Sequence, residues 1–454
     1  MGVLLFSFIS IIFVLQIFLQ KGYKKLLWFF VGVLFFPSSI VIITNPNIPF
    51  PRVMIISLML AFLLRSKNVK AQFYKFPLHF SISSIAIVLL FIGLFDSRLD
   101  FFTRLIRPIN YFLENFIIVF LTFFYVKSMH EVRKIYNFIL ICFLFFSLYG
   151  IVNYLTGISS YTSFIAETYN TRDFGNGYSI NGDERLRISS FAWHPIYYGF
   201  LVACAILILI FIYSEKRMQV YSTFFYSTLF GLLIMNLFWT NSRTPLLALI
   251  IGLCYYYLFA FKFGNKIKIA LTGIIALFFV ISVSPNALKL VDESINTFTA
   301  KGSKLEGSSL EMREMQMGAS LLIFNQNPIF GNGFNYITEN LGFSSDEKKR
   351  SSDNEFQGFE SYSYKLLIEQ GLIGILGNVA FFISILVFFL KKRKKVNLLG
   401  KKIIHLSLGM FITFLLFIFG TGDMGVFLIF MSLLGVNIKA IVLLANRTQE
   451  NIQS

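Results

Sequence analysis

Long apolar runs alternate with short polar connections along almost the whole chain of 454 residues. A helix needs about 20 apolar residues to cross a bilayer, and only helices or closed barrels satisfy their backbone groups in lipid. These runs are too long and too continuously apolar for barrel strands. The pattern therefore predicts an all-α, polytopic membrane helix bundle with about 12–13 transmembrane helices. The predicted spans are residues 2–20, 26–44, 52–64, 79–95, 108–126, 135–156, 194–213, 221–239, 245–261, 267–284, 359–390, 403–419 and 424–444.

Lysine clusters set the expected orientation of this bundle. Every second connection is rich in lysine, most clearly the run KKRKK at 391–395, and such connections stay on the cytoplasmic side. The N-terminus is then external and the C-terminus cytoplasmic. Residues 1–454 are expected to form a single integral-membrane domain with two long external loops, at 157–193 and 285–358.

The larger external loop is too long for a simple connection. Within it, residues 308–324 place Leu310, Met317 and Leu321 near helical spacing, which predicts an amphipathic helix on the outer face. The polar stretch 344–355 is a candidate lid.

Composition narrows the class of function. The chain is 56% hydrophobic and 14% charged, whereas soluble proteins average roughly 25% charged residues. The net charge of +17 does not indicate nucleic acid, because the basic residues lie between apolar runs, where anionic membrane lipid is the expected partner. The cysteines lie inside apolar runs, the four histidines are scattered, and no soluble catalytic motif is present. We therefore expect metal-independent chemistry without a cofactor.

Arginine alone supplies positive charge to the short external connections and to the 157–193 loop. Its planar guanidinium suits bidentate binding of phosphate, and contact with outer-leaflet headgroups is the alternative. Span interiors are almost bare of charge, with Glu114 as the main exception, which argues against a transport pathway through the membrane. The external arginines are Arg52, Arg98, Arg104, Arg107, Arg172, Arg185, Arg187 and Arg243.

Four segments carry a family resemblance. They are RISSFAWHPIYYGFLV at 187–202, NSRTPLLALIIG at 241–252, REMQMGASLLIFNQNPIFGNGF at 313–334 and GFESYSYKLLIEQGLIG at 358–374. In this order and spacing they resemble the integral-membrane O-antigen polymerase/ligase family of the Wzy and WaaL type.

The resemblance implies glycosyl transfer at the external face of the bacterial cytoplasmic (inner) membrane. The donor would be an oligosaccharide linked to undecaprenyl diphosphate, and the acceptor another lipid-linked repeat or the lipid A core. Arg187, Arg243 and Arg313 occupy the motif positions at which the family binds the diphosphate, with Arg185 as a fourth candidate. Membrane lipid, a chain-length regulator and a flippase are the further partners that we expect.

The stretch FESYSY contains the candidate catalytic residue. The ligase branch has a histidine before this span, whereas this chain has Glu360, so the polymerase branch is favoured. Glu360 has no cationic neighbour one turn away, while Lys365 and Glu369 are spaced to pair on one helix face. A role as base or in orienting the acceptor, a pairing with arginine and a solvated helix start all remain open for Glu360.

Other side chains in these motifs are weaker candidates. His194 could contact substrate or form a structural hydrogen bond at the start of its span. Tyr362 and Tyr364 could stack on sugar rings or pack within the protein. Asp353 and Glu355 are rival carboxylates in the candidate lid.

The leading hypothesis is an inverting polymerase of O-antigen, capsule or exopolysaccharide repeat units. The alternatives are an O-antigen ligase that transfers to lipid A core or another final acceptor, a transporter of lipid-linked oligosaccharide, and a non-catalytic scaffold of an export complex.

Overall fold

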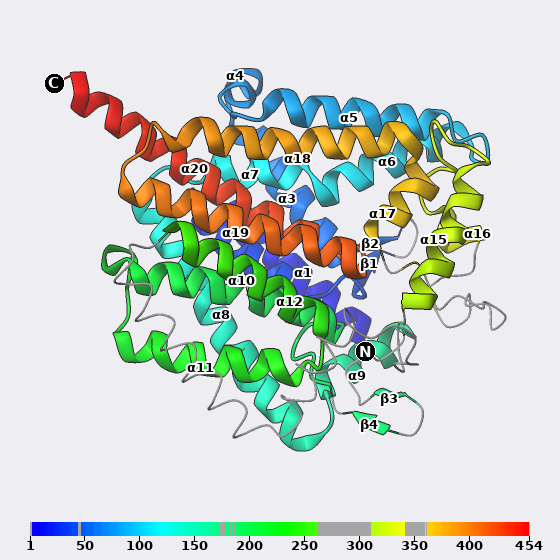
Figure 1. Ribbon diagram of the computed structural model, residues 1–454, viewed down its shortest axis with the longest axis horizontal. Coiled ribbons are helices and arrows are strands. Elements are labelled where there is room, and N and C mark those ends of the chain that lie inside the picture. Colours follow the sequence, from blue (N-terminus) through cyan, green and yellow to red (C-terminus); the bar gives the residue numbers. More distant parts are fainter. Residues whose placement is uncertain are drawn as a thin grey trace.

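The fold is an all-α bundle with two small strand pairs (Figure 1). The computed structural model describes residues 2–43, 47–171, 178–180, 183–185, 187–260, 310–340, 359 and 361–453, and their side chains except at 178–180, 183–185, 310–312 and 448–453. The predicted span at 267–284 and the candidate lid at 344–355 lie outside the described residues.

Twenty helical segments and two strand pairs make up the described chain. The first helices are α1 (Gly2–Leu19), α2 (Lys24–Phe35), α3 (Phe50–Arg65), α4 (Val69–Tyr74), α5 (His79–Leu94), α6 (Phe101–Asn115), α7 (Ile117–Tyr125), α8 (Met129–Thr156) and α9 (Ser160–Tyr169). They are followed by α10 (Pro195–Ser214), the 3₁₀ turn η1 (Lys216–Met218), α11 (Thr223–Trp239), α12 (Arg243–Ala260), α15 (Leu310–Phe324) and α16 (Tyr336–Asn340). The last are α17 (Tyr362–Lys365), the π-helical turn η3 (Leu366–Gln370), α18 (Gly371–Arg393), α19 (Leu398–Thr421) and α20 (Val426–Gln453). The antiparallel strand pairs are β1 (Val41–Ile43) with β2 (Ile48–Pro49), and β3 (Tyr178–Ile180) with β4 (Asp183–Arg185).

The apolar helices confirm a polytopic membrane protein. Among the described residues, seven helical segments are long and apolar enough to cross a bilayer, or eight if the bent pair α6–α7 counts as one span. Helices α5 and α11 are apolar but shorter. The predicted amphipathic helix at 308–324 is present as α15.

Two predicted spans differ from the structure. The run at 26–44 is helical only to Phe35, because Pro37 follows and the chain turns into the β1–β2 pair. The run at 108–126 is broken at Phe116, where α6 and α7 meet at 44°. Glu114, predicted inside this span, pairs with Arg52 of α3 at 2.7 Å.

Helix α10 lies at the centre of the bundle, and 83% of the residues in its most apolar stretch are buried. Helices α12 and α19 flank it and approach each other closely at Gly252, where an added Cβ would lie 2.1 Å from Thr413 Oγ1. Gly199 of α10 likewise accommodates Pro245 of α12. These small-residue contacts fix the start of α12 beside the start of α10.

Most of the elements that do not cross the bundle lie at one end of it. In Figure 1 the long helices run across the view, and α15, α16 and α17 gather at the right. Helices α10, α12 and α18 begin at this end, which contains Arg187, Arg243 and Arg313 and is called the arginine end below.

Candidate active site

Arg187 is held against the loop that leads into α12. Its Nε donates to the carbonyl oxygen of Thr240 at 3.1 Å, and its Nη2 donates to Ser242 Oγ at 2.8 Å. The backbone N–H of Ile188 also donates to the carbonyl oxygen of Trp239. These contacts place the 187 segment next to Arg243, the first residue of α12.

The start of α12 also lies next to the end of α19. Gly420 of α19 packs against Thr244, and an added Cβ at Gly420 would lie 2.7 Å from Thr244 Cγ2. Arg313 of α15 donates from Nη2 to the carbonyl oxygen of Gly420 at 2.8 Å. The segments that contain these three arginines, which are far apart in sequence, therefore meet around the first turn of α12. The N-terminus of a helix itself favours an anion, because its N–H groups and dipole present positive charge.

The amphipathic pattern of α15 explains why Arg313 faces inward. Gln316 and Ser320 are fully buried, and they lie three and seven residues after Arg313, on the same face of the helix. The apolar Met317 and Leu322 are exposed on the other side. Helix α15 thus presents an apolar face away from the bundle and turns the polar face that contains Arg313 toward it.

A second group of polar side chains adjoins Arg313. Tyr364 Oη donates to the carbonyl oxygen of Arg313 at 3.2 Å. The next residue, Lys365, forms an ion pair of 2.8 Å with Asp423 in the turn between α19 and α20. Lys365 thus forms its ion pair with Asp423, a partner that the sequence did not predict, while Glu369 still interacts with Lys365 electrostatically, as the helical spacing predicts.

Residues 327–334, the Asn-Pro-Ile-Phe-Gly-Asn-Gly-Phe segment called the hook below, fasten α15 to the start of α18. The N–H groups of Asn332 and Gly333 donate to the carbonyl oxygens of Ile368 and Glu369 at 2.8 and 3.0 Å. In return, the N–H groups of Leu372 and Ile373 donate to the carbonyl oxygens at 328 and 329 of the hook, at 2.9 and 3.1 Å. Four backbone hydrogen bonds thus hold the two motifs in register.

Comparison with known proteins identifies this region. The family model described as O-antigen ligase matches residues 228–379, about a third of the chain. Over these residues the chain is similar to the O-antigen polymerase/ligase family. No curated protein matches it.

The O-antigen ligase match contains most of the site. Arg243, Arg313, the hook and η3 lie inside it, while Arg187 precedes it and reaches the site through Thr240 and Ser242. The resemblance of the sequence motifs is therefore confirmed at the level of the family.

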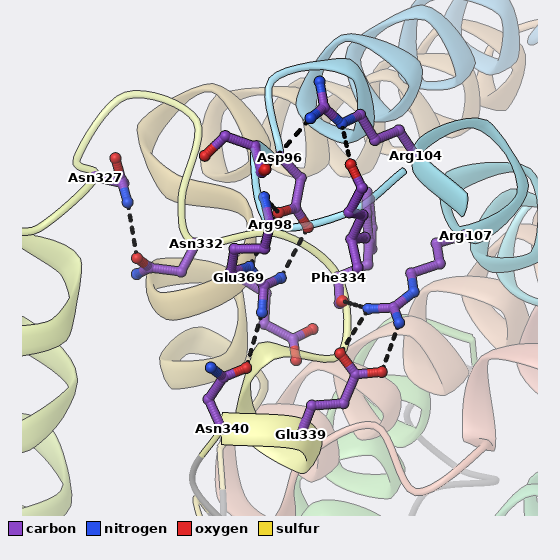
Figure 2. A network of polar contacts seen from close by, with 12 residues as sticks. Asp96, Arg98, Arg104, Arg107, Asn327, Asn332, Phe334, Glu339, Asn340 and Glu369 are labelled. Carbon is purple, nitrogen blue, oxygen red and sulfur yellow. Dashed lines mark hydrogen bonds and ion pairs between the residues drawn. The ribbon is translucent and has the colours of Figure 1, made fainter. Parts of the chain in front are cut away.

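Four other arginines that the sequence predicts to be external have protein partners that the phosphate hypothesis did not anticipate. Arg52 pairs with Glu114, Arg98 with Asp96 and Arg107 with Glu339. Arg104 donates to the carbonyl oxygens of Leu99 and Ser97. Figure 2 shows Arg98 and Arg107 extending from the α5–α6 region toward α16.

The remaining predicted site residues have different surroundings. Glu360 lies outside the described residues, as do the side chain of Arg185 and the rival carboxylates Asp353 and Glu355. His194 caps α10, its Nδ1 accepting a hydrogen bond from the N–H of Ile196 at 3.1 Å.

Tyr362 is fully buried. Its hydroxyl group hydrogen-bonds to Tyr111 Oη at 2.8 Å and donates to Asn378 Oδ1 at 3.0 Å. This environment assigns Tyr362 to packing rather than to stacking on a sugar, whereas Tyr364 is half-buried and adjoins Arg313.

Sequence reasoning did not anticipate Asp96 and Glu339. Asp96 is buried beside Arg98. The two residues are only two positions apart in a turn, and this spacing was the signal in the sequence that could have predicted their ion pair. Glu339 lies 232 residues from Arg107, so no local pattern could connect them. Within the described ranges, no three metal-ligating side chains come together.

Proposed function

We propose that the protein polymerises oligosaccharide repeat units carried on undecaprenyl diphosphate, at the arginine end of the bundle on the external face of the membrane. The observation that carries this proposal is the convergence of Arg187, Arg243 and Arg313 on the first turn of α12. The similarity of residues 228–379 to the O-antigen ligase family supports glycan polymerisation or ligation as the reaction class.

The transfer requires charge stabilisation at the leaving group. The acceptor hydroxyl attacks the anomeric carbon from the face opposite the diphosphate, a new C–O bond forms, and the bond from the anomeric carbon to the diphosphate oxygen breaks. The electron pair leaves with the lipid diphosphate. Arginines fixed around that oxygen stabilise the developing negative charge more in the transition state than in the ground state.

The hydroxyl proton requires an acceptor, and Glu360 is the residue that we propose. It directly precedes Ser361, the N-cap of α17, whose Tyr364 hydrogen-bonds to the backbone of Arg313. The ring of Phe359, on the other side of Glu360 in the chain, packs against Tyr364. The described residues on either side of Glu360 are therefore connected to Arg313 through Tyr364.

Chain growth can be measured directly. The donor is the lipid-linked repeat unit extracted from the source strain in which this gene has been deleted, incubated with the purified protein in detergent. We expect a ladder of polymer with release of undecaprenyl diphosphate. The absence of any chain growth with this donor would refute the polymerase assignment.

The same assay distinguishes polymerisation from ligation. Ligation is the second candidate, because the matching family model is described as O-antigen ligase. Transfer of the glycan to added lipid A core, without elongation of the lipid-linked repeat, would assign the protein as a ligase. Movement of the donor across sealed vesicles without bond formation would instead assign a transporter.

A further inference from the structure

The arginines near α5 and α6 form a second cluster at the arginine end, and Figure 2 shows how they reach the hook and α16. Arg107 donates from Nη1 to the carbonyl oxygen of Phe334 at 2.8 Å, and its Nη1 and Nη2 bind both carboxylate oxygens of Glu339 at 2.9 and 2.5 Å. A bidentate guanidinium–carboxylate pair has defined geometry in addition to charge.

Arg98 makes the second connection. Its Nε and Nη2 bind the two oxygens of Asp96 at 2.9 and 2.8 Å, its Nη1 donates to Asn340 Oδ1 at 2.9 Å, and its guanidinium lies 4.9 Å from the centre of the Tyr336 ring. Asp96 is only 2% exposed. Arg98 therefore joins a buried acid of the α5–α6 turn to both ends of α16.

The hook itself packs into the same corner. Phe330 stacks on Phe95 with ring centres 4.0 Å apart, and Phe334 contacts the ring of Tyr111. At Gly333, with φ of +92°, an added Cβ would lie 1.9 Å from Asp96 Oδ2. Backbone, aromatic and ionic contacts thus attach residues 327–340 to α5 and α6.

We propose that Arg98 and Arg107 are positioning residues for the glycosyl transfer, acting through residues 327–340 on Arg313, and we call their two ion pairs, Asp96–Arg98 and Arg107–Glu339, the latch. The hook begins three residues after α15 ends, and α15 carries Arg313. The hook is also hydrogen-bonded to η3 and to the first residues of α18. The latch therefore holds the hook, and through it η3, against α6, a helix that contains none of the arginines Arg187, Arg243 and Arg313.

This inference rests on the proposed function, and it separates two roles that an external arginine could have. An arginine that binds the donor diphosphate needs its own positive charge at its own position. An arginine that acts through an ion pair needs only that the pair exists. Exchanging the two charges distinguishes these roles.

The test uses the Arg107–Glu339 pair, because the side chain of Glu339 is 42% exposed whereas that of Asp96 in the other pair is buried, and breaking a more exposed ion pair costs less global stability. We expect Arg107→Ala and Glu339→Ala each to lower kcat for chain growth by about 10- to 100-fold, the scale of a small misplacement at a reacting centre. The exchanged variant, Arg107→Glu with Glu339→Arg, restores the ion pair but not the hydrogen bond to Phe334, and it is expected to recover part of the lost rate. The matched control is Arg52→Ala, which breaks the pair with Glu114 but does not touch residues 327–340, and it should retain the wild-type rate.

Two kinetic results would overturn the inference. The first is a wild-type rate of chain growth in Glu339→Ala. The second is a rate in the exchanged variant no higher than that of Arg107→Ala, together with weaker binding of undecaprenyl diphosphate to both variants that lack Arg107. Amide hydrogen exchange of residues 310–340 provides a readout without catalysis. It should quicken in both single variants and slow again in the exchanged variant, and unchanged exchange in the single variants would refute the latch. If the wild-type protein shows no chain growth, the proposed function fails while the exchange experiment still decides on the latch.

Discussion

Replacing Gly331 by alanine is expected to separate the hook from the start of α18. Gly331 has φ of +74°, and an added Cβ would lie 2.5 Å from the backbone N of Gln370 and 2.5 Å from the carbonyl carbon of Glu369. Both contacts are to main-chain atoms, so no side-chain rotation can make room. The two segments must move apart, which strains the four hydrogen bonds between them.

The size of the effect follows from two terms. A non-glycine residue in the left-handed region costs about 1–2 kcal/mol, and forcing extra atoms into a packed contact costs about 1–3 kcal/mol. The closed state of the hook should thus lose about 2–5 kcal/mol. Since each 1.4 kcal/mol is a factor of ten, the equilibrium for opening should rise by roughly 30-fold to a few thousandfold.

Hydrogen exchange measured by mass spectrometry reports this opening directly. Peptides covering residues 328–334 and 366–373 should exchange faster in Gly331→Ala, while α10 and α19 keep their wild-type protection, and chain growth should fall in parallel. Gly318→Ala is the matched control, because this exposed position on α15 has no atom within 4 Å of an added Cβ. Wild-type exchange in Gly331→Ala would refute the close approach of the hook to η3.

Three further predictions concern chemistry and pH. Arg243→Lys should lower kcat/KM by about 10-fold or more, since bidentate contact with a diphosphate is lost, and wild-type kinetics at equal expression would remove Arg243 from the diphosphate site. Glu360→Gln should lower kcat by about 100-fold or more with little change in the KM of the donor; a pure KM effect would contradict its role as base. The pKa of Asp100, the N-cap of α6, is lowered by hydrogen bonds from the hydroxyl and N–H groups of Thr103. Because the folded-state pKa lies below the unfolded value near ~3.9, the cap stabilises α6 above that pH and is lost as pH falls through the lower folded value. Hydrogen exchange of the first turn of α6 should quicken in that window for the wild type, whereas Asp100→Asn should show no such step.

The apolar runs predicted most helices because burial in lipid imposes a simple length and composition on each span. Their interruptions were harder to predict. The break at Phe116 directly follows the polar residues Glu114 and Asn115, and beyond it α7 packs against α20, which is distant in sequence. Pro37 was a visible signal for the early end of α2, but the strand pair that follows it has no strong local pattern.

The site was predictable only in part, for a related reason. Motif positions indicated Arg187, Arg243 and Arg313, and the structure brings these three segments together. Helical spacing predicted Glu369 as the neighbour of Lys365, but it could not predict Asp423, which lies 58 residues away and forms the ion pair. Local periodicity specifies neighbours on a regular helix, but it cannot specify contacts made across an irregular turn.

The arginines at the arginine end divide into two groups according to the acceptor that each one binds, a carboxylate or a neutral carbonyl oxygen. Arg98 and Arg107 bind carboxylates, which cancel their charge and leave little attraction for a diphosphate. Among the described residues, the hydrogen bond that Arg313 donates goes to the neutral carbonyl oxygen of Gly420. This bond fixes the guanidinium in place without removing its positive charge. A fixed positive charge stabilises a leaving diphosphate without reorganisation during the reaction. This is the role proposed above for Arg313, and the carboxylate-paired arginines are suited to holding Arg313 in place.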